Sequence, residues 1–106
     1  MSLPLDDIIA RSRQILQQAY GPRFQGLVWY GSTARGEAFP ESDIDLLVLL
    51  TPPVDYFTEL WRIIQWLYPL QLESERLLSA KPVAADTYAR APLALFQSAR
   101  EEGIRA

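Results

Sequence analysis

The sequence predicts an α/β (α+β) fold in which a small mixed β-sheet has helices packed on it. Two short apolar runs, residues 26–30 and 44–50, are bounded by turn residues, as is typical of strands. Two longer segments, residues 5–20 and 55–68, have the periodicity of helices. Because 106 residues supply one core but not two, we expect a single domain over residues 1–106.

The first predicted helix covers residues 5–20. Apolar and small side chains recur on one of its faces, at Ile8, Ile9, Ser12, Ile15, Leu16 and Ala19. Gly21 and Pro22 follow and should end the helix, because glycine favours the position after a helix and proline cannot continue it.

The strands are expected at residues 26–30, at 44–50 and within 75–83. The second run is apolar on both faces beyond Asp45, which indicates a central strand in a covered sheet. The third run is shorter and is interrupted by Pro82.

The helix at residues 55–68 should be capped by Asp55 and should stop before Pro69. Its core stripe is expected at Phe57, Leu60, Trp61, Ile64 and Leu67. Tyr56, Ile63 and Trp66 widen the stripe and leave a narrow polar face that includes Glu59. This breadth predicts either a deeply buried helix or a helix with one flank facing a second chain.

The last predicted helix covers residues 92–102, with Pro92 near its start and Gly103 after its end. The expected order is therefore helix, strand, strand, helix, strand, helix, which places helices between the strands of a small mixed sheet.

Composition excludes several classes of function. The chain has no cysteine and no histidine, so it cannot hold a thiolate zinc site or a Ser-His-Asp triad. The net charge is -3 with one lysine, and no basic stretch points to a nucleic acid. No segment resembles a signal peptide or a membrane span, so we expect a cytoplasmic protein.

Gly31 and Ser32 follow the first predicted strand directly. A glycine there lets the backbone turn sharply and approach a ligand closely. The Ser32 hydroxyl and the backbone N–H groups of a short helix starting near Thr33 would form an anion site, with Arg35 placed to contact a phosphate.

Asp43 and Asp45 open the second predicted strand. Side chains two residues apart in a strand project from the same face, so the two carboxylates repel each other unless a cation lies between them. Mg²⁺ accepts such a pair together with water and phosphate oxygens. Next to the Gly31-Ser32 turn, the pair predicts a site for a nucleoside triphosphate and one or two Mg²⁺ ions.

The motifs resemble the signature of the minimal nucleotidyltransferases, a branch of the DNA polymerase beta superfamily. The matching positions are Gly31, Ser32, Ala34, Arg35 and Gly36, followed by Ser42, Asp43, Asp45, Leu46 and Val48. The resemblance implies the nucleotidyltransferase fold, with Asp43 and Asp45 as metal ligands and catalytic residues and Ser32 as a phosphate contact. Arg35 and Gly36 match the motif, and their roles could be purely structural.

Active members of this family generally use a third carboxylate on a neighbouring strand. When we count back from Glu102, Gly103 and Ile104, the position of this third carboxylate falls near Ser79. Glu73 and Glu75 have the same strand parity as Ser79 and could replace it if the strand begins early; they could equally be solvated charges at the strand entrance.

The resemblance implies transfer of a nucleoside monophosphate, AMP from ATP, to a hydroxyl. Similar proteins are commonly encoded beside a small helical HEPN-type protein and act as its antitoxin, so we expect such a partner. The alternatives are an inactive module that neutralises its partner by binding, and a transferase for a small hydroxylated compound. The sequence is also compatible with a homo-oligomer.

Overall fold

Four strands form one mixed sheet in the order β3-β2-β1-β4. The computed structural model describes residues 3–36, 42–91 and 93–106. Along the chain, the elements are α1 (Leu5–Tyr20), η1 (Gly21–Arg23), β1 (Phe24–Tyr30), α2 (Gly31–Ala34), β2 (Ile44–Leu50), α3 (Tyr56–Leu72), β3 (Leu78–Ala84), α4 (Ala85–Arg90), α5 (Ala94–Glu102) and β4 (Ile104–Arg105).

The central position predicted for β2 is confirmed. It pairs antiparallel with β1 and parallel with β3. The register places Tyr30 of β1 and Ser79 of β3 on either side of Asp45. These three residues form a row across the sheet, at the end where β1 finishes and β2 and β3 begin.

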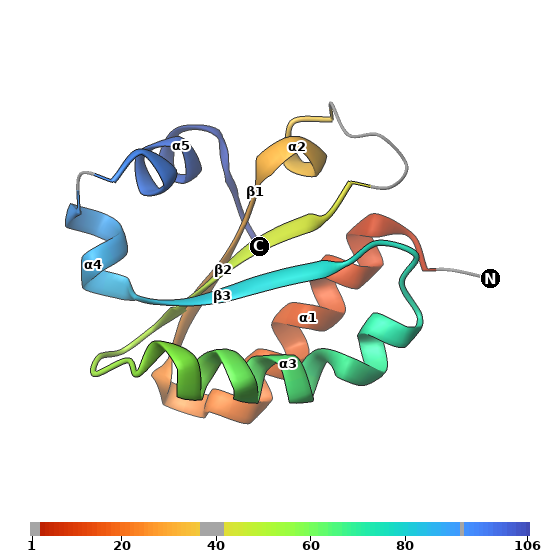
Figure 1. The fold of residues 1–106 in the computed structure, drawn as a ribbon, viewed down its shortest axis with the longest axis horizontal. Coiled ribbons are helices and arrows are strands. Elements are labelled where there is room, and N and C mark those ends of the chain that lie inside the picture. Colours follow the sequence, from red (N-terminus) through yellow and green to blue (C-terminus); the bar gives the residue numbers. More distant parts are fainter. Residues whose placement is uncertain (1–2, 37–41, 92) are drawn as a thin grey trace.

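Helices cover both faces of the sheet (Figure 1). Residues of α1 and α3 pack against one face, where the larger core includes Leu16, Leu46, Val48 and Ile63. Side chains of α4 and α5 cover part of the other face, where Tyr88, Phe96 and Ala99 meet Val28 and Leu47. The alternation along β2 therefore directs Asp45 and Leu47 to the second face and Leu46 and Val48 to the first.

The helix α3 continues through Pro69 to Leu72, so the prediction that it stops before Pro69 is wrong. Proline removes one backbone hydrogen bond from the helix. Continuing the helix places Leu70 in the core and lets the Gln71 side chain accept from the Leu78 N–H at 2.7 Å, which joins the helix end to β3. These gains offset the lost bond.

The buried side of α3 also differs from the prediction. The buried residues are Glu59, Ile63, Leu67 and Leu70, whereas Phe57, Trp61 and Ile64 are exposed. Apolar residues cover so much of the helix surface that the sequence is compatible with the predicted buried side and with the observed one. The exposed residues show that the helix is not fully buried. The alternative, a flank that faces a second chain, remains open.

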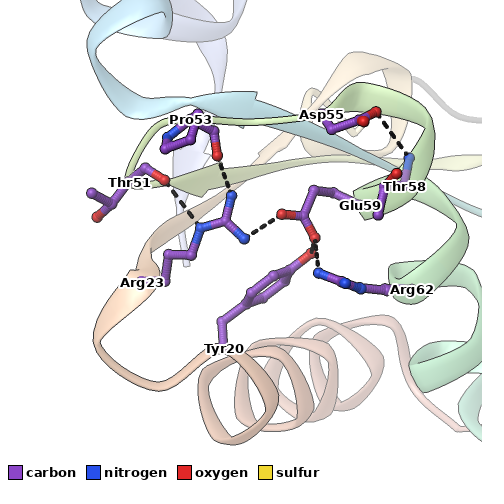
Figure 2. A network of polar contacts seen from close by, with 8 residues as sticks. All are labelled: Tyr20, Arg23, Thr51, Pro53, Asp55, Thr58, Glu59 and Arg62. Carbon is purple, nitrogen blue, oxygen red and sulfur yellow. Dashed lines mark hydrogen bonds and ion pairs between the residues drawn. The ribbon is translucent and has the colours of Figure 1, made fainter.

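Glu59 is buried because three neighbours satisfy its carboxylate (Figure 2). Arg23 forms an ion pair with it, Arg62 donates at 3.1 Å, and the Tyr20 hydroxyl donates at 3.3 Å. Arg23 also donates to the carbonyls of Thr51 and Pro53. This network ties α1, the end of β2 and the start of α3 together.

The sequence did not reveal α4 or the short strand β4, which pairs with β1 through Ile104 and Arg105. The final helix begins at Ala94, and Pro92, where its start was expected, lies outside the described residues. Among the residues that the structure describes, no helix combines the length and hydropathy needed to cross a bilayer.

Candidate functional site

The turn at Gly31 lies directly against Asp45. Gly31 has a φ of 81°, a left-handed value that favours glycine. A Cβ atom at this position would collide with Oδ2 of Asp45. Glycine is therefore required both for the turn and for the close approach of the carboxylate to the backbone. The structure therefore brings the turn and this aspartate together, and their joint role as a binding site stays a prediction.

Asp45 lies in an electrostatic setting suited to a cation. Burial raises the pKa of its carboxyl, the negative charge of Asp43 raises it further, and the ammonium group of Lys81 lowers it. The influence of Asp43 indicates that the two carboxylates are neighbours. A divalent ion between them would remove their repulsion and favour the ionised form.

Asp43 is exposed at the entrance to β2. The backbone on both sides of it is held by the segment before β3: Arg76 donates to the Ser42 carbonyl at 3.1 Å, and the Ile44 N–H donates to the Leu77 carbonyl at 2.8 Å. These contacts keep the start of β2 in place beside the turn.

A partly buried hydrogen bond anchors the helix α2 to β1. Trp29 donates its indole N–H to the Thr33 hydroxyl at 2.9 Å, and Thr33 is buried. Ser32 is only partly buried and lies in the first turn of α2. The expected short helix is therefore present, beginning at Gly31, and Ser32 remains a predicted phosphate contact.

A pocket of about 330 Å³ opens beside the turn. Tyr30, Gly31 and Arg35 line one side, and Leu95, Ser98 and Glu102 of α5 line the other. The Arg35 guanidinium lies 3.4 Å from the Glu102 carboxylate across it. Arg35 thus borders this pocket, and its contact with a phosphate stays a prediction.

The row Tyr30, Asp45 and Ser79 shows what lies on either side of the aspartate. Burial raises the pKa of the Tyr30 phenol to about 12, and the negative charge of Asp45 contributes to the rise. Tyr30 therefore stays protonated at neutral pH. On the other side, neighbouring strands lie about 4.8 Å apart, so the short Ser79 side chain leaves space next to Asp45.

Neither Glu73 nor Glu75 supplies a third carboxylate on this strand. Because β3 begins at Leu78, both residues precede it, and the condition of an early start is not met. Glu73 forms an exposed ion pair with Arg11 of α1, 3.5 Å apart. Glu75 lines a small pocket with Leu3, Leu5 and Ile8. In the described parts of the chain, no three acidic residues converge as a metal site.

The two aspartates nevertheless fit Mg²⁺. This ion commonly binds one or two carboxylates and completes its shell with water and substrate phosphates. Asp43 and Asp45 would hold it, and because Asp45 contacts Gly31, the ion would lie next to backbone that can approach a phosphate. A bound ion would neutralise charge on the phosphates during transfer.

Sequence reasoning missed three residues that shape the site: Tyr30, Arg76 and Lys81. Lys81 is the only lysine, and it lies two residues after Ser79 on the same face of the sheet. Once Ser79 is aligned with Asp45, the two-residue spacing places Lys81 on the same sheet face as Asp45. The roles of Tyr30 and Arg76 depend on the sheet register and on a backbone carbonyl, which leave no signal in a single sequence.

Comparisons with solved structures support the fold. A toxin–antitoxin complex with AMP-PNP contains a chain with a TM-score of 0.61 and 22% identity, covering 96% of this chain and 72% of that one. A putative nucleotidyltransferase from Sulfolobus solfataricus has a TM-score of 0.61 and 13% identity, covering 94% and 79%. A mutant of the toxin–antitoxin MntA-HpeT has a TM-score of 0.57 and 24% identity, covering 99% and 72%.

No curated protein sequence shows significant similarity to this chain. The family model described as a nucleotidyltransferase domain matches residues 9–82, which include the turn, both aspartates and β1 to β3 up to Pro82. The fold and this match agree with the resemblance found in the motifs, and the chain belongs to the nucleotidyltransferase domain family.

Proposed function

We propose that the chain transfers AMP from ATP to a hydroxyl group of a partner protein, in the cytoplasm, as the antitoxin of a HEPN/MNT-type toxin–antitoxin pair. The observation that carries the proposal is the contact between Asp45 and the Gly31 turn, with the charge of Asp43 nearby. This arrangement places a cation site beside a turn that can approach a triphosphate.

In this proposal the protein contributes positioning and electrostatics. Ser32 and the backbone of α2 bind the β- and γ-phosphates, and Asp43 and Asp45 hold Mg²⁺. The acceptor hydroxyl gives its proton to water and its oxygen forms a bond to the α-phosphorus, while the bond from that phosphorus to the leaving pyrophosphate breaks. Tyr30, protonated beside Asp45, offers a hydrogen-bond donor to the same region.

The antitoxin role is supported by two similar chains in structures described as toxin–antitoxin complexes, one of them with AMP-PNP. In this proposal the partner protein brings the acceptor hydroxyl to the site. The acidic net charge of -3 argues against a polynucleotide as acceptor.

The experiment is to co-purify the protein with its native partner and incubate the complex with Mg²⁺ and ATP labelled at the α-phosphate. Label on the partner supports the proposal. Because the acceptor oxygen attacks the α-phosphorus, ATP labelled at the γ-phosphate should give none. Label from the γ-phosphate, or no label with either nucleotide, would contradict it.

A second candidate function is favoured by Ser79, which lies opposite Asp45 where active relatives are expected to have a third acid. With only two carboxylates at the described site, the chain could bind its partner and nucleotide without efficient transfer. It would then neutralise the partner by contact.

Ser79→Asp separates the two candidates. An aspartate here lies next to Asp45 on the adjacent strand and would complete a three-carboxylate site. If the natural chain acts by binding, this variant should raise AMP transfer by about tenfold or more. If the natural chain with Ser79 is already an active transferase, AMP transfer by the variant should be equal to that of the wild type or lower. Ser79→Asn is the size-matched control without the charge.

A further inference from the structure

The outer side of α3 carries a continuous apolar stripe. Five residues that follow one another at helical spacing form it: Phe57, Trp61, Ile64, Tyr68 and Leu72. Each is between 48% and 78% exposed. We call this set the outer stripe. Spacings of three and four residues keep all five on one side of the helix over its full length.

The outer stripe is separate from the core. Ile63, Leu67 and Leu70 face the sheet from the opposite side of α3. Core packing therefore does not account for the stripe, and a helix that only covered the sheet would carry polar side chains outward. Tyr56 and Leu77, both exposed, border the same surface, since they line a groove together with Ile64 and Tyr68.

The size of this surface matches what a stable dimer needs. With about 200 Å² of accessible area for each large apolar side chain, the stripe and its two bordering residues offer about 800 Å². Two copies would bury about 1,600 Å², the size of a standard specific interface. An exposed apolar patch this large exceeds what most monomers carry.

The stripe is also complementary to itself. If two α3 helices pack antiparallel about a point between positions 64 and 65, Phe57 meets Leu72 of the second copy, Trp61 meets Tyr68, and Ile64 lies beside its equivalent. Such isologous contacts are typical of twofold dimers. No charged residue belongs to the stripe, and nearby Arg62 bonds to Glu59 of its own chain, so the packing brings no like charges together.

From these observations we propose that the outer stripe of α3 is a dimer interface occupied by a second copy of this chain. The helix α3 packs on the sheet face opposite to the one that α4 and α5 cover (Figure 1), and the alternation along β2 directs Asp45 to that second face. The proposal does not depend on the enzymatic role.

Sedimentation equilibrium of the isolated chain tests the proposal, from about 1 µM to about 200 µM. The wild type should change from the mass of one chain to that of two. Trp61→Glu combined with Tyr68→Glu should remain a single chain throughout, with a dissociation constant raised by about a hundredfold or more. A wild type that stays a single chain at the highest concentration, or a double variant that still dimerises, overturns the proposal.

Gln14→Glu combined with Gln18→Glu is the matched control. It adds the same charge on exposed positions of α1 and should dimerise as the wild type does. Binding of Mg²⁺-ATP, measured by calorimetry, should be equal in the wild type and in the Trp61/Tyr68 variant. This readout separates failure of the interface from failure of the nucleotide site.

Cysteine cross-linking tests the antiparallel register, because the chain has no cysteine of its own. With a short thiol-specific cross-linker, Ile64→Cys should link to itself. Phe57→Cys should not, but a mixture of Phe57→Cys and Leu72→Cys should link. Linkage of Phe57→Cys to itself, without linkage of the mixture, would contradict the arrangement.

Discussion

Gly31 is the residue on which the site depends most directly, because its missing side chain makes room for the Asp45 carboxylate. We predict that Gly31→Ala weakens Mg²⁺-ATP binding by about tenfold or more, since the new methyl group must displace that carboxylate. The left-handed backbone adds about 1 kcal/mol of strain. Calorimetric titration with ATP at saturating Mg²⁺ measures the change.

Gly36→Ala is the control for that strain. Gly36 also has a left-handed φ, 72°, but a Cβ there meets no atom of the described residues within 4 Å. It should lose similar stability while keeping nucleotide affinity. Equal affinity losses in the two variants would show that backbone strain, and not the contact with Asp45, is responsible.

The raised pKa of Asp45 predicts a pH effect on stability. A carboxyl whose pKa is higher in the folded state favours folding while it is protonated. This contribution is lost as the pH rises above 3.8, the ordinary pKa of an aspartate, and through the pKa of the folded state. Without metal, Asp45→Asn should therefore melt a few degrees higher than the wild type near neutral pH, with the difference closing below about pH 4.

Melting curves with EDTA from acidic to neutral pH test this point. Asp6→Asn, at an exposed position in the first turn of α1, serves as the control for loss of a surface carboxylate. A wild type at least as stable as Asp45→Asn at neutral pH would show that the buried charge is already compensated without metal.

Among the elements, α3 depends on the buried carboxylate of Glu59, which joins the helix to η1 and α1. Its side chain is 4% exposed and is neutralised by Arg23 and Arg62. Glu59→Gln removes the charge and leaves both guanidinium groups without their acid. We predict a loss of about 3 kcal/mol in the free energy of unfolding, measured with urea.

Glu73→Gln is the comparison, because Glu73 forms an ion pair with Arg11 in which both side chains are about half exposed. Water screens such a pair, so its loss should cost less than about 1 kcal/mol. Similar losses in the two variants would mean that burial of Glu59 does not set its contribution.

The elements of the fold could largely be predicted from the sequence. Hydrophobic periodicity located α1, β1, β2 and α3, and the pattern on both faces of β2 indicated its central position. The rotation of α3 was not predictable, because apolar residues surround most of that helix and Glu59 looks like a surface residue until Arg23 is brought beside it. Pro69 was misjudged because burial of Leu70 outweighs a lost hydrogen bond.

The candidate site was predictable where its residues adjoin in sequence. Gly31 and Ser32, and Asp43 and Asp45, are short-range motifs, and the structure brings Gly31 and Asp45 together. Tyr30 joins the site through strand pairing, and one sequence does not supply the register that places it there. The family resemblance had already pointed to Ser79, and the register places it opposite Asp45.

In the whole molecule, the sheet separates the proposed dimer surface from the proposed nucleotide site. The face covered by α1 and α3 holds the larger core, and the outer side of α3 offers the proposed dimer surface. The opposite face carries Asp45 at the end of the sheet, beside the pocket between α2 and α5. We therefore expect that separate mutations can remove the proposed nucleotide binding and the proposed dimer independently.

The central claim is that Asp43 and Asp45 hold a divalent ion against a triphosphate beside the Gly31 turn. The most direct test is the melting temperature of the chain with and without Mg²⁺-ATP, compared with Asp43→Asn combined with Asp45→Asn. At millimolar ligand, the wild type should melt about 5 °C higher or more, and the double variant should not shift. An unchanged wild type, or an equal shift in the variant, would contradict the claim.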